Sequence, residues 1–145
     1  MKNNILVIGG GSIGRRHLTN LNLLKYKNLF CLKRVYNSKF EKEYNCIVIT
    51  ASEDIKTYDI NILIVCTPTS LHIKSIEFGI KNNCHIFMEK PLTHDLSTYL
   101  KIKKLLKNHK KVFFIGFMLR YHPFIKKIKD TLKTEELGSV YSSAF

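Results

Sequence analysis

Several residue types are scarce in this 145-residue chain. It contains no tryptophan, three prolines and four cysteines, and 24 lysines and arginines outnumber 11 acidic residues. No apolar run reaches the roughly 20 residues of a membrane-spanning helix, because lysine or asparagine interrupts each one. The first apolar stretch runs into glycines and not into a signal-peptide cleavage site. We therefore expect a cytoplasmic α/β protein without a membrane anchor.

The cysteines lie at positions 31, 46, 66 and 84, and no pair has metal-ligand spacing. Three of them fall in or beside apolar segments that read as buried strands. Reduced thiols in the core of a cytoplasmic protein are the simplest interpretation. The sequence also lacks a Ser-His-Asp, paired-carboxylate or metal-binding pattern, so we expect no metal and no independent hydrolytic chemistry.

The formal charge of +13 raises the hypothesis of a basic domain that binds nucleic acid. The densest basic stretch, KIKKLLKNHKK at residues 101–111, keeps its apolar residues at helical spacing, which places the lysines on a solvated face. Aromatic residues do not alternate with the basic ones, as stacking on bases would require. We therefore disfavour specific nucleic-acid binding.

A glycine-rich turn, GGGSIG, occupies residues 9–14. It follows the apolar run Ile5–Ile8, typical of a strand buried on both faces, and precedes apolar residues at helical spacing. Glycines at a strand-to-helix turn let a pyrophosphate approach the backbone, and the helix N-terminus attracts the anion. A purely structural turn is the alternative. The predicted dinucleotide-phosphate site consists of Gly9, Gly11, Ser12, Ile13 and Gly14.

Strand-like and helix-like segments alternate along the chain. Strands are predicted at 5–8, 29–33, 46–50, 60–67, 85–89 and 112–118. Helices are predicted at 12–24, 70–82, 95–108 and 123–137, with short helical turns at 39–44 and 53–58. Such alternation predicts an α/β fold, a doubly wound (Rossmann) parallel sheet in the order 3-2-1-4-5-6 with helices on both faces.

Ligands of such sheets bind at the carboxyl ends of the strands, where the strand order reverses. The fourth strand ends in CTPTSLH, from Cys66 to His72, and the fifth ends in MEKPL, from Met88 to Leu92. Thr69 or Ser70 is expected to cap the next helix, with or without a contact to the cofactor. A surface salt bridge between Glu89 and Lys90, without a role in ligand binding, is the alternative interpretation of that pair.

The second strand ends in two cations, Lys33 and Arg34, and no acidic residue occurs between positions 29 and 40. Domains selective for NAD carry an acid here that binds the ribose 2′-hydroxyl. Cations attract the 2′-phosphate of NADP, arginine through a forked pair of hydrogen bonds. NADP(H) is therefore favoured over NAD(H), with two solvated loop charges as the alternative.

Five motifs in this order, GGGSIGRRHL, CTPTSLH, MEKPL, GFMLRYHP and LGSVYSSAF, resemble the N-terminal half of the Gfo/Idh/MocA family, along the whole chain. That family contains NAD(P)-dependent oxidoreductases of sugars and polyols. The resemblance implies that Lys90 is the catalytic lysine near the reacting hydroxyl, beside Glu89. It implies a cis peptide bond before Pro91. The further cofactor contacts that it implies are Cys66, Thr67, Pro68, Thr69, His72, Glu89, Lys90, Pro91 and Arg120.

The family continues into a second, α+β domain that binds the substrate, forms much of the oligomer interface and carries a catalytic histidine. We predict that residues 1–120 form the dinucleotide-binding domain, and that 121–145 form a connecting helix and the first strand, VYSSAF, of that domain. A chain truncated at Phe145 should then bind the cofactor without oxidising a sugar or polyol, and the full-length form should be a homo-oligomer. The alternative is a non-catalytic dinucleotide-binding module or remnant.

Overall fold

A computed structural model of the chain describes residues 3–134, 138–139 and 142. Six parallel strands form one sheet in the order β3-β2-β1-β4-β5-β6, which confirms the predicted doubly wound topology. The strands are β1 Asn4–Ile8, β2 Asn28–Leu32, β3 Ile47–Ile49, β4 Ile62–Val65, β5 His85–Met88 and β6 Phe113–Ile115. The helices are α1 Ser12–Leu23, α2 Ser38–Tyr44, α3 His72–Lys81, α4 Leu96–Leu106 and α5 Pro123–Lys133. Three short 3₁₀ helices are η1 Glu53–Tyr58, η2 Thr69–Leu71 and η3 Met118–Tyr121.

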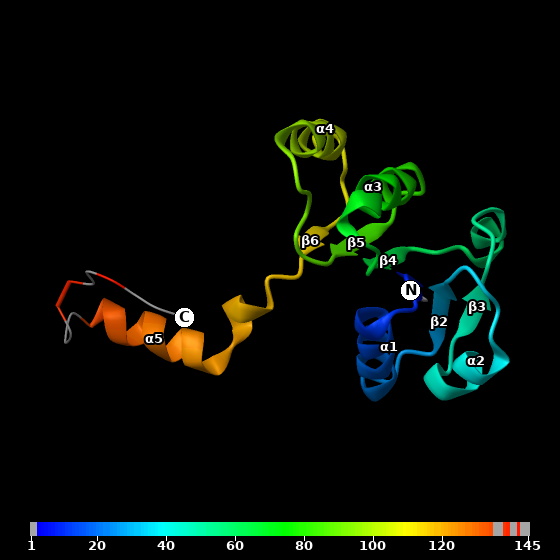
Figure 1. Cartoon of the computed structure of the whole chain (residues 1–145), viewed down its shortest axis with the longest axis horizontal. Helices are drawn as coiled ribbons and strands as arrows, with labels where there is room; N and C mark the ends of the chain where they lie inside the picture. Colours follow the sequence, from blue (N-terminus) through cyan, green and yellow to red (C-terminus); the bar gives the residue numbers. More distant parts are fainter. Residues whose placement is uncertain (1–2, 135–137, 140–141, 143–145) are drawn as a thin grey trace.

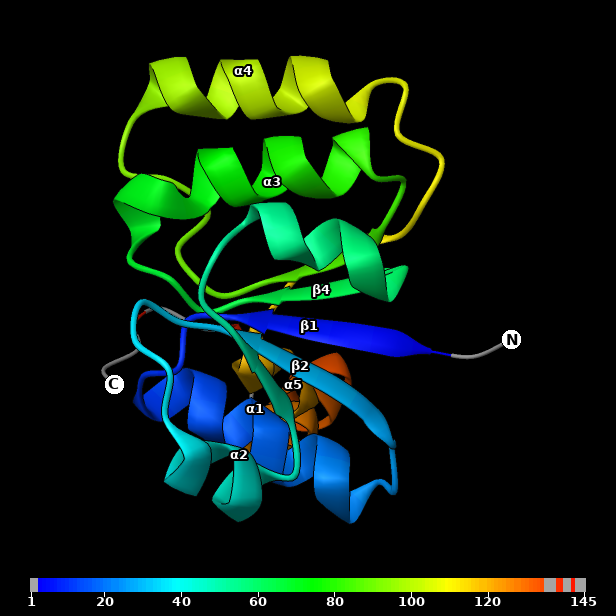
Figure 2. The ribbon, with the colours of Figure 1, turned by 90° about the vertical axis from the view of Figure 1, so that its right-hand side faces the viewer.

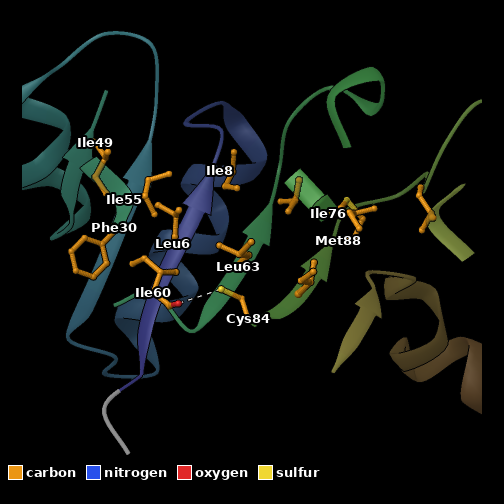
Figure 3. Close-up of a cluster of buried hydrophobic side chains, with 13 residues drawn as sticks. Leu6, Ile8, Phe30, Ile49, Ile55, Ile60, Leu63, Ile76, Cys84 and Met88 are labelled. Carbon is orange, nitrogen blue, oxygen red and sulfur yellow. Dashed lines mark hydrogen bonds between the residues drawn. The ribbon is translucent and has the colours of Figure 1, made fainter. Parts of the chain in front are cut away.

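Helices cover both faces of the sheet, because successive strand residues point to opposite sides and both sets are apolar. Leu6 and Ile8 of β1 join a buried cluster that includes Ile76 of α3 (Figure 3). Ile5 and Val7 join a second cluster against α1 and α2. Figure 2 shows α3 and α4 on one side of the strands and α1 and α2 on the other.

Asparagine and aspartate cap two helices in the described structure, whereas the predicted cap of α3 is wrong. The side chain of Asn37 accepts a hydrogen bond from the Phe40 amide of α2, and that of Asp95 accepts one from the Thr98 amide of α4, both at 2.8 Å. Neither η2 nor α3 has a side-chain cap. The 3₁₀ turn begins at Thr69 itself, directly after the extended Pro68, so the hydroxyl lies inside the turn and not before it.

Two strands end two or three residues earlier than the sequence predicts. The fourth strand ends at Val65 and not at 67, and the sixth ends at Ile115 and not at 118. Beyond Ile115 the backbone closes tight turns, since Phe117 N donates to Ile115 O and Met118 N donates to Gly116 O. These local bonds replace strand pairing and lead directly into η3.

Helix α5 projects away from the sheet and its flanking helices (Figure 1). None of its residues is buried, and Phe124 at its start is 74% exposed. The predicted extension of this helix to 137 and, apart from Ser142, the predicted strand at 140–145 lie outside the described residues. Within the described part of the chain, no helix combines the length and apolarity that crossing a membrane requires.

Candidate functional site

An open cavity of about 730 Å³ lies at the carboxyl edge of the sheet, beside the ends of β1 and β4, where the strand order reverses. The glycine turn forms one wall, and the segments after β2, β3 and β4 form the others. The lining residues are Ile8, Gly9, Gly10, Gly11, Ser12, Ile13, Leu32, Lys33, Arg34, Thr50, Ser52, Cys66, Thr67, Pro68 and Leu71.

Two glycines of the turn are required by packing. Gly9 has φ +105°, and a Cβ there would lie 2.9 Å from the carbonyl oxygen of Cys66. A Cβ on Gly14 would collide with the carbonyl oxygen of Gly9, and Gly14 is buried where α1 crosses the turn. These contacts hold the start of α1 close to the ends of β1 and β4, as the sequence predicts for the first and third glycines.

Gly11 differs from the other two, because no atom lies within 4 Å of the position that its Cβ would take. It is exposed and forms the N-cap of α1, without a capping side chain. The first amide groups of a helix have no partner within the helix and carry the positive end of its dipole. Open space in front of these donors is a place where a pyrophosphate fits.

The far wall of the cavity is positively charged. The Lys33 ammonium lies 3.9 Å from the centroid of the Phe40 ring, and its methylene stem runs beside Gly10. Arg34 is exposed and makes no hydrogen bond or ion pair with the described residues. None of the lining residues is acidic. The cavity can therefore receive an anion with little electrostatic opposition.

The segment after β4 is anchored to β1 by a hydrogen bond from Cys66 N to Ile8 O (2.8 Å). Burial, followed by the nearby charge of Glu89, raises the pKa of the Cys66 thiol to about 12, so this thiol is protonated at neutral pH. The hydroxyl of Thr67 is buried without a hydrogen-bond partner among the described residues. The cavity therefore has one unused polar group beside its apolar wall.

His72 is not on the cavity wall, although it belongs to the same motif. Its side chain is 1% exposed, and its ring nitrogens face two main-chain carbonyl groups instead. A direct contact between His72 and a ligand of the cavity does not fit this burial. In this structure both ring nitrogens have internal partners, and the cofactor contact of His72 stays a prediction.

The residues after β5 take up two different environments. Lys90 is exposed, and the Lys90–Pro91 peptide bond is cis, as the sequence resemblance implied. Glu89 does not pair with Lys90, because its Oε1 lies 2.7 Å from Nε2 of His17 on α1. The His17–Glu89 pair borders a smaller pocket of about 270 Å³ on the α1 side, whose lining includes Phe87, Phe114, Phe117 and Tyr121.

Six predicted residues besides His72 are absent from the cavity lining. Gly14 is buried in α1, Glu89 borders the smaller pocket, and the other four are Thr69, Lys90, Pro91 and Arg120. Thr69 is within η2, and Lys90 and Pro91 follow β5. Arg120 is exposed on η3, where its guanidinium carbon lies 5.8 Å from the centroid of the Phe117 ring.

Sequence reasoning missed Thr50 and Ser52, which line the cavity after β3. Their position at a carboxyl strand end was the available signal, because that edge collects the binding residues of such sheets. No group of three or more histidine, cysteine, aspartate or glutamate side chains among the described residues is arranged to hold a metal ion.

A family of oxidoreductases with an NAD-binding Rossmann fold, Gfo/Idh/MocA, matches residues 3–117. The chain belongs to this family. It is 29% identical, over 96% of its length, to scyllo-inositol 2-dehydrogenase (NAD⁺) of Bacillus subtilis. It is 27% identical, over 91% of its length, to myo-inositol 2-dehydrogenase of Thermotoga maritima. The chain spans only 43% and 41% of these two relatives.

Among solved structures, the scyllo-inositol dehydrogenase of Lactobacillus casei with bound NAD(H) and scyllo-inositol superimposes with a TM-score of 0.81. The match covers 96% of this chain and 43% of that enzyme at 21% identity, so it shows the shared fold. Together with the family match, it identifies the described sheet as the NAD-binding Rossmann domain of this oxidoreductase family.

Proposed function

We propose that this chain is the cofactor-binding part of an enzyme that transfers hydride between a nicotinamide dinucleotide and a hydroxyl group of a sugar or polyol. The observation that carries the proposal is the cavity in front of Gly11. This cavity is bordered by the first amide groups of α1 and by two cationic side chains, and no acidic residue lines it. The family match and the activities of the inositol dehydrogenase relatives named above support the reaction class.

The proposed cofactor is NADP(H) in preference to NAD(H). Lys33 and Arg34 follow β2, where the adenosine ribose lies in this fold, and the hydroxyl-bearing Thr50 and Ser52 face them from the segment after β3. A 2′-phosphate would gain charge-assisted hydrogen bonds from such a set. Two of the named relatives, from Bacillus subtilis and Lactobacillus casei, are described with NAD⁺ or NAD(H), so this chain would differ from those two in cofactor choice.

Lys90 is the proposed catalytic residue. When bound, the nicotinamide ring supplies or accepts the hydride. Oxidation of a hydroxyl also releases a proton, and a lysine within reach of that hydroxyl can take it up. Lys90 is exposed and follows Glu89, whose amide makes the last hydrogen bond to β4 through Val65 O. Thr69, Pro91 and Arg120 remain proposed contacts of the same ligand pair.

A second domain is the remaining part of the proposal. The relatives are more than twice as long as this chain, and α5 leads away from the sheet without burying a residue. In the proposed enzyme, residues after 120 connect to a substrate domain that closes over Lys90, and this domain also carries the contacts of a homo-oligomer.

Calorimetric titration of the 145-residue chain with NADPH and NADH tests the cofactor proposal. We expect tighter binding of NADPH, and we expect Arg34→Ala to reduce this difference, whereas Lys81→Ala, on the exposed end of α3, leaves it unchanged. Equal or tighter NADH binding would contradict the NADP(H) preference. Absence of binding by either cofactor would contradict the whole proposal.

The reaction is tested by following reduction of the cofactor with a panel of sugars and polyols. We expect no substantial turnover by residues 1–145 and turnover by a longer protein that includes the second domain, lost in Lys90→Ala. Robust turnover by the 145-residue chain would contradict the proposed need for a second domain. A dinucleotide-binding module without catalysis remains the second candidate, because Lys90 stands exposed with no described partner.

A further inference from the structure

A buried histidine opens helix α3 directly behind the cofactor crevice. His72 is 1% exposed, and among the described residues only it and Ser75 are polar and buried. A buried polar side chain is costly unless its polar atoms find partners. The neighbouring buried position on α3, Ile76, shows that an apolar side chain can fill this layer. The presence of an imidazole ring at this buried position is therefore explained by its hydrogen bonds.

Both ring nitrogens of His72 face main-chain carbonyl groups. Nε2 lies 3.0 Å from the carbonyl oxygen of Thr67, and Nδ1 lies 3.2 Å from that of Leu92. A carbonyl oxygen only accepts, so each contact needs a proton on the ring nitrogen. A neutral imidazole donates to one of the two, and an imidazolium donates to both. In either state the ring lies between the two carbonyl groups.

The two carbonyl groups belong to loops that leave neighbouring strands. Thr67 lies two residues after β4 and lines the large cavity, whereas Leu92 lies two residues after Lys90. Strands β4 and β5 are parallel and adjacent, so both loops open at the same edge of the sheet. His72 thus connects the cavity wall to the segment that carries Lys90.

We propose that His72 is a positioning residue, which fixes the Lys90 loop relative to the nicotinamide half of the cofactor site. This inference deepens the proposed function and rests on it. In a doubly wound sheet the first three strands bind the adenosine half of the dinucleotide, and the next three bind the nicotinamide half. The bridge made by His72 lies wholly in the second half, away from Lys33 and Arg34.

This position predicts a selective effect on binding. Loss of the bridge should weaken binding of the intact dinucleotide, which spans both halves of the site. It should not weaken binding of 2′-phospho-AMP, a probe that needs only the glycine turn and the segments after β2 and β3. A general loss of stability would not change one dissociation constant relative to the other, once binding is expressed per folded molecule. The ratio of the two dissociation constants therefore separates positioning from support of the fold.

The experiment compares His72→Leu, which fills the space without a donor, with His72→Gln, which keeps one. Ile76→Val is the control, because it trims a fully buried side chain of the same helix that contacts neither loop through a hydrogen bond. Titrations with NADPH, or with NADH if that binds better, and with 2′-phospho-AMP give both dissociation constants. Hydrogen exchange measured by mass spectrometry follows the amides of residues 89, 90, 92 and 93, since Pro91 has no amide hydrogen.

For His72→Leu we expect roughly tenfold weaker binding of the dinucleotide, the equivalent of one lost hydrogen bond, and less than a twofold change for 2′-phospho-AMP. Exchange at 89–93 should accelerate. His72→Gln should recover part of both effects, and Ile76→Val should show neither. If His72→Leu does not fold, the comparison of His72→Gln with Ile76→Val decides, and we then expect only the glutamine variant to change the ratio.

An unchanged ratio of dissociation constants together with unchanged exchange at 89–93, in the folded His72 variants, would overturn the positioning role. Failure of the wild-type chain to bind any dinucleotide would instead overturn the proposed function. In that case the exchange measurement still shows whether His72 holds the Lys90 loop, so the two failures are distinguishable.

Discussion

Gly11 and Gly14 lie three residues apart, yet alanine should affect them in opposite ways. At Gly11, with φ −74° and ψ −169°, the backbone is one that alanine adopts, and no atom lies near the new Cβ. Alanine is a weaker N-cap than glycine by up to about 1 kcal/mol, but it lowers the entropy of the unfolded chain by a similar amount. We expect the free energy of unfolding of Gly11→Ala to stay within about 1 kcal/mol of wild type.

Binding is where Gly11→Ala should fail. Its methyl group would occupy the open space in front of the first amides of α1, where the pyrophosphate is proposed to lie. Loss of charge-assisted hydrogen bonds costs about 1.5–3 kcal/mol, which corresponds to roughly 10- to 150-fold weaker binding. The measurements are urea unfolding followed by circular dichroism and calorimetric titration with the preferred cofactor.

Gly14→Ala should fail in folding instead. Its Cβ would meet the main-chain carbonyl of Gly9, and a backbone atom cannot rotate away as a side chain can. We expect a loss of at least about 1–3 kcal/mol, the usual cost of overpacking. Gly79→Ala is the matched control, because its Cβ would press on Ile86 and Leu63 in the core, far from the cavity. It should lose stability and keep wild-type affinity per folded molecule.

Wild-type affinity in Gly11→Ala would refute the assignment of the pyrophosphate to this turn. Wild-type stability in Gly14→Ala would refute the packing argument. Loss of affinity in folded Gly79→Ala would show that binding follows general stability, and the comparison of Gly11 with Gly14 would then lose its meaning.

Three further predictions concern charge and protonation. Arg34→Glu should weaken NADPH binding at least tenfold while NADH binding changes little, and equal losses for both cofactors in calorimetric titrations would contradict this. The Ser97 hydroxyl and the Thr98 amide hold the pKa of Asp95 well below its usual range. The stabilising effect of the Asp95 carboxylate is therefore present above about pH 4 and is lost as the pH falls. Urea unfolding should show Asp95→Ala less stable than wild type at pH 7, and this difference in stability should narrow below pH 4. The Cys66 pKa of about 12 lies above the ordinary thiol value near 9, so the contribution of this thiol to stability is complete below pH 9 and disappears toward pH 12. Cys66 should also resist iodoacetamide at pH 8 in the folded protein and react with it in urea. Fast labelling of the folded protein would contradict the burial of Cys66.

The sheet order could be predicted because each strand carries its own signal. Residues 5–8 of β1 and all of β4 are apolar, which is typical of strands buried on both faces, and segments with helical spacing lie between the two strands. The end of β6 and the start of α3 could be predicted less accurately than the sheet order. Pairing stops after Ile115 because local turns compete with the sheet, and composition does not decide that competition.

The lining of the candidate site could be predicted only in part. The glycine turn, the two cations after β2 and the segment after β4 were visible, since each combines a residue type with a strand end. Thr50 and Ser52 carry no such motif and join the cavity only because β3 lies beside β2. The burial of His72 could not be predicted, because a sequence motif does not tell which side of a helix start faces the interior.

The His17–Glu89 contact bears on the cofactor site as a whole. Glu89 is the acidic residue that immediately follows β5, and a free carboxylate there would oppose the phosphates of a dinucleotide. Its Oε1 lies 2.7 Å from His17, and both side chains border the smaller pocket and not the large cavity. The cavity therefore keeps the charge of its two cations. Lys33 is already engaged with the Phe40 ring, whereas Arg34 is exposed with all its donors unused by the described residues, so discrimination for a 2′-phosphate should depend more on Arg34 than on Lys33.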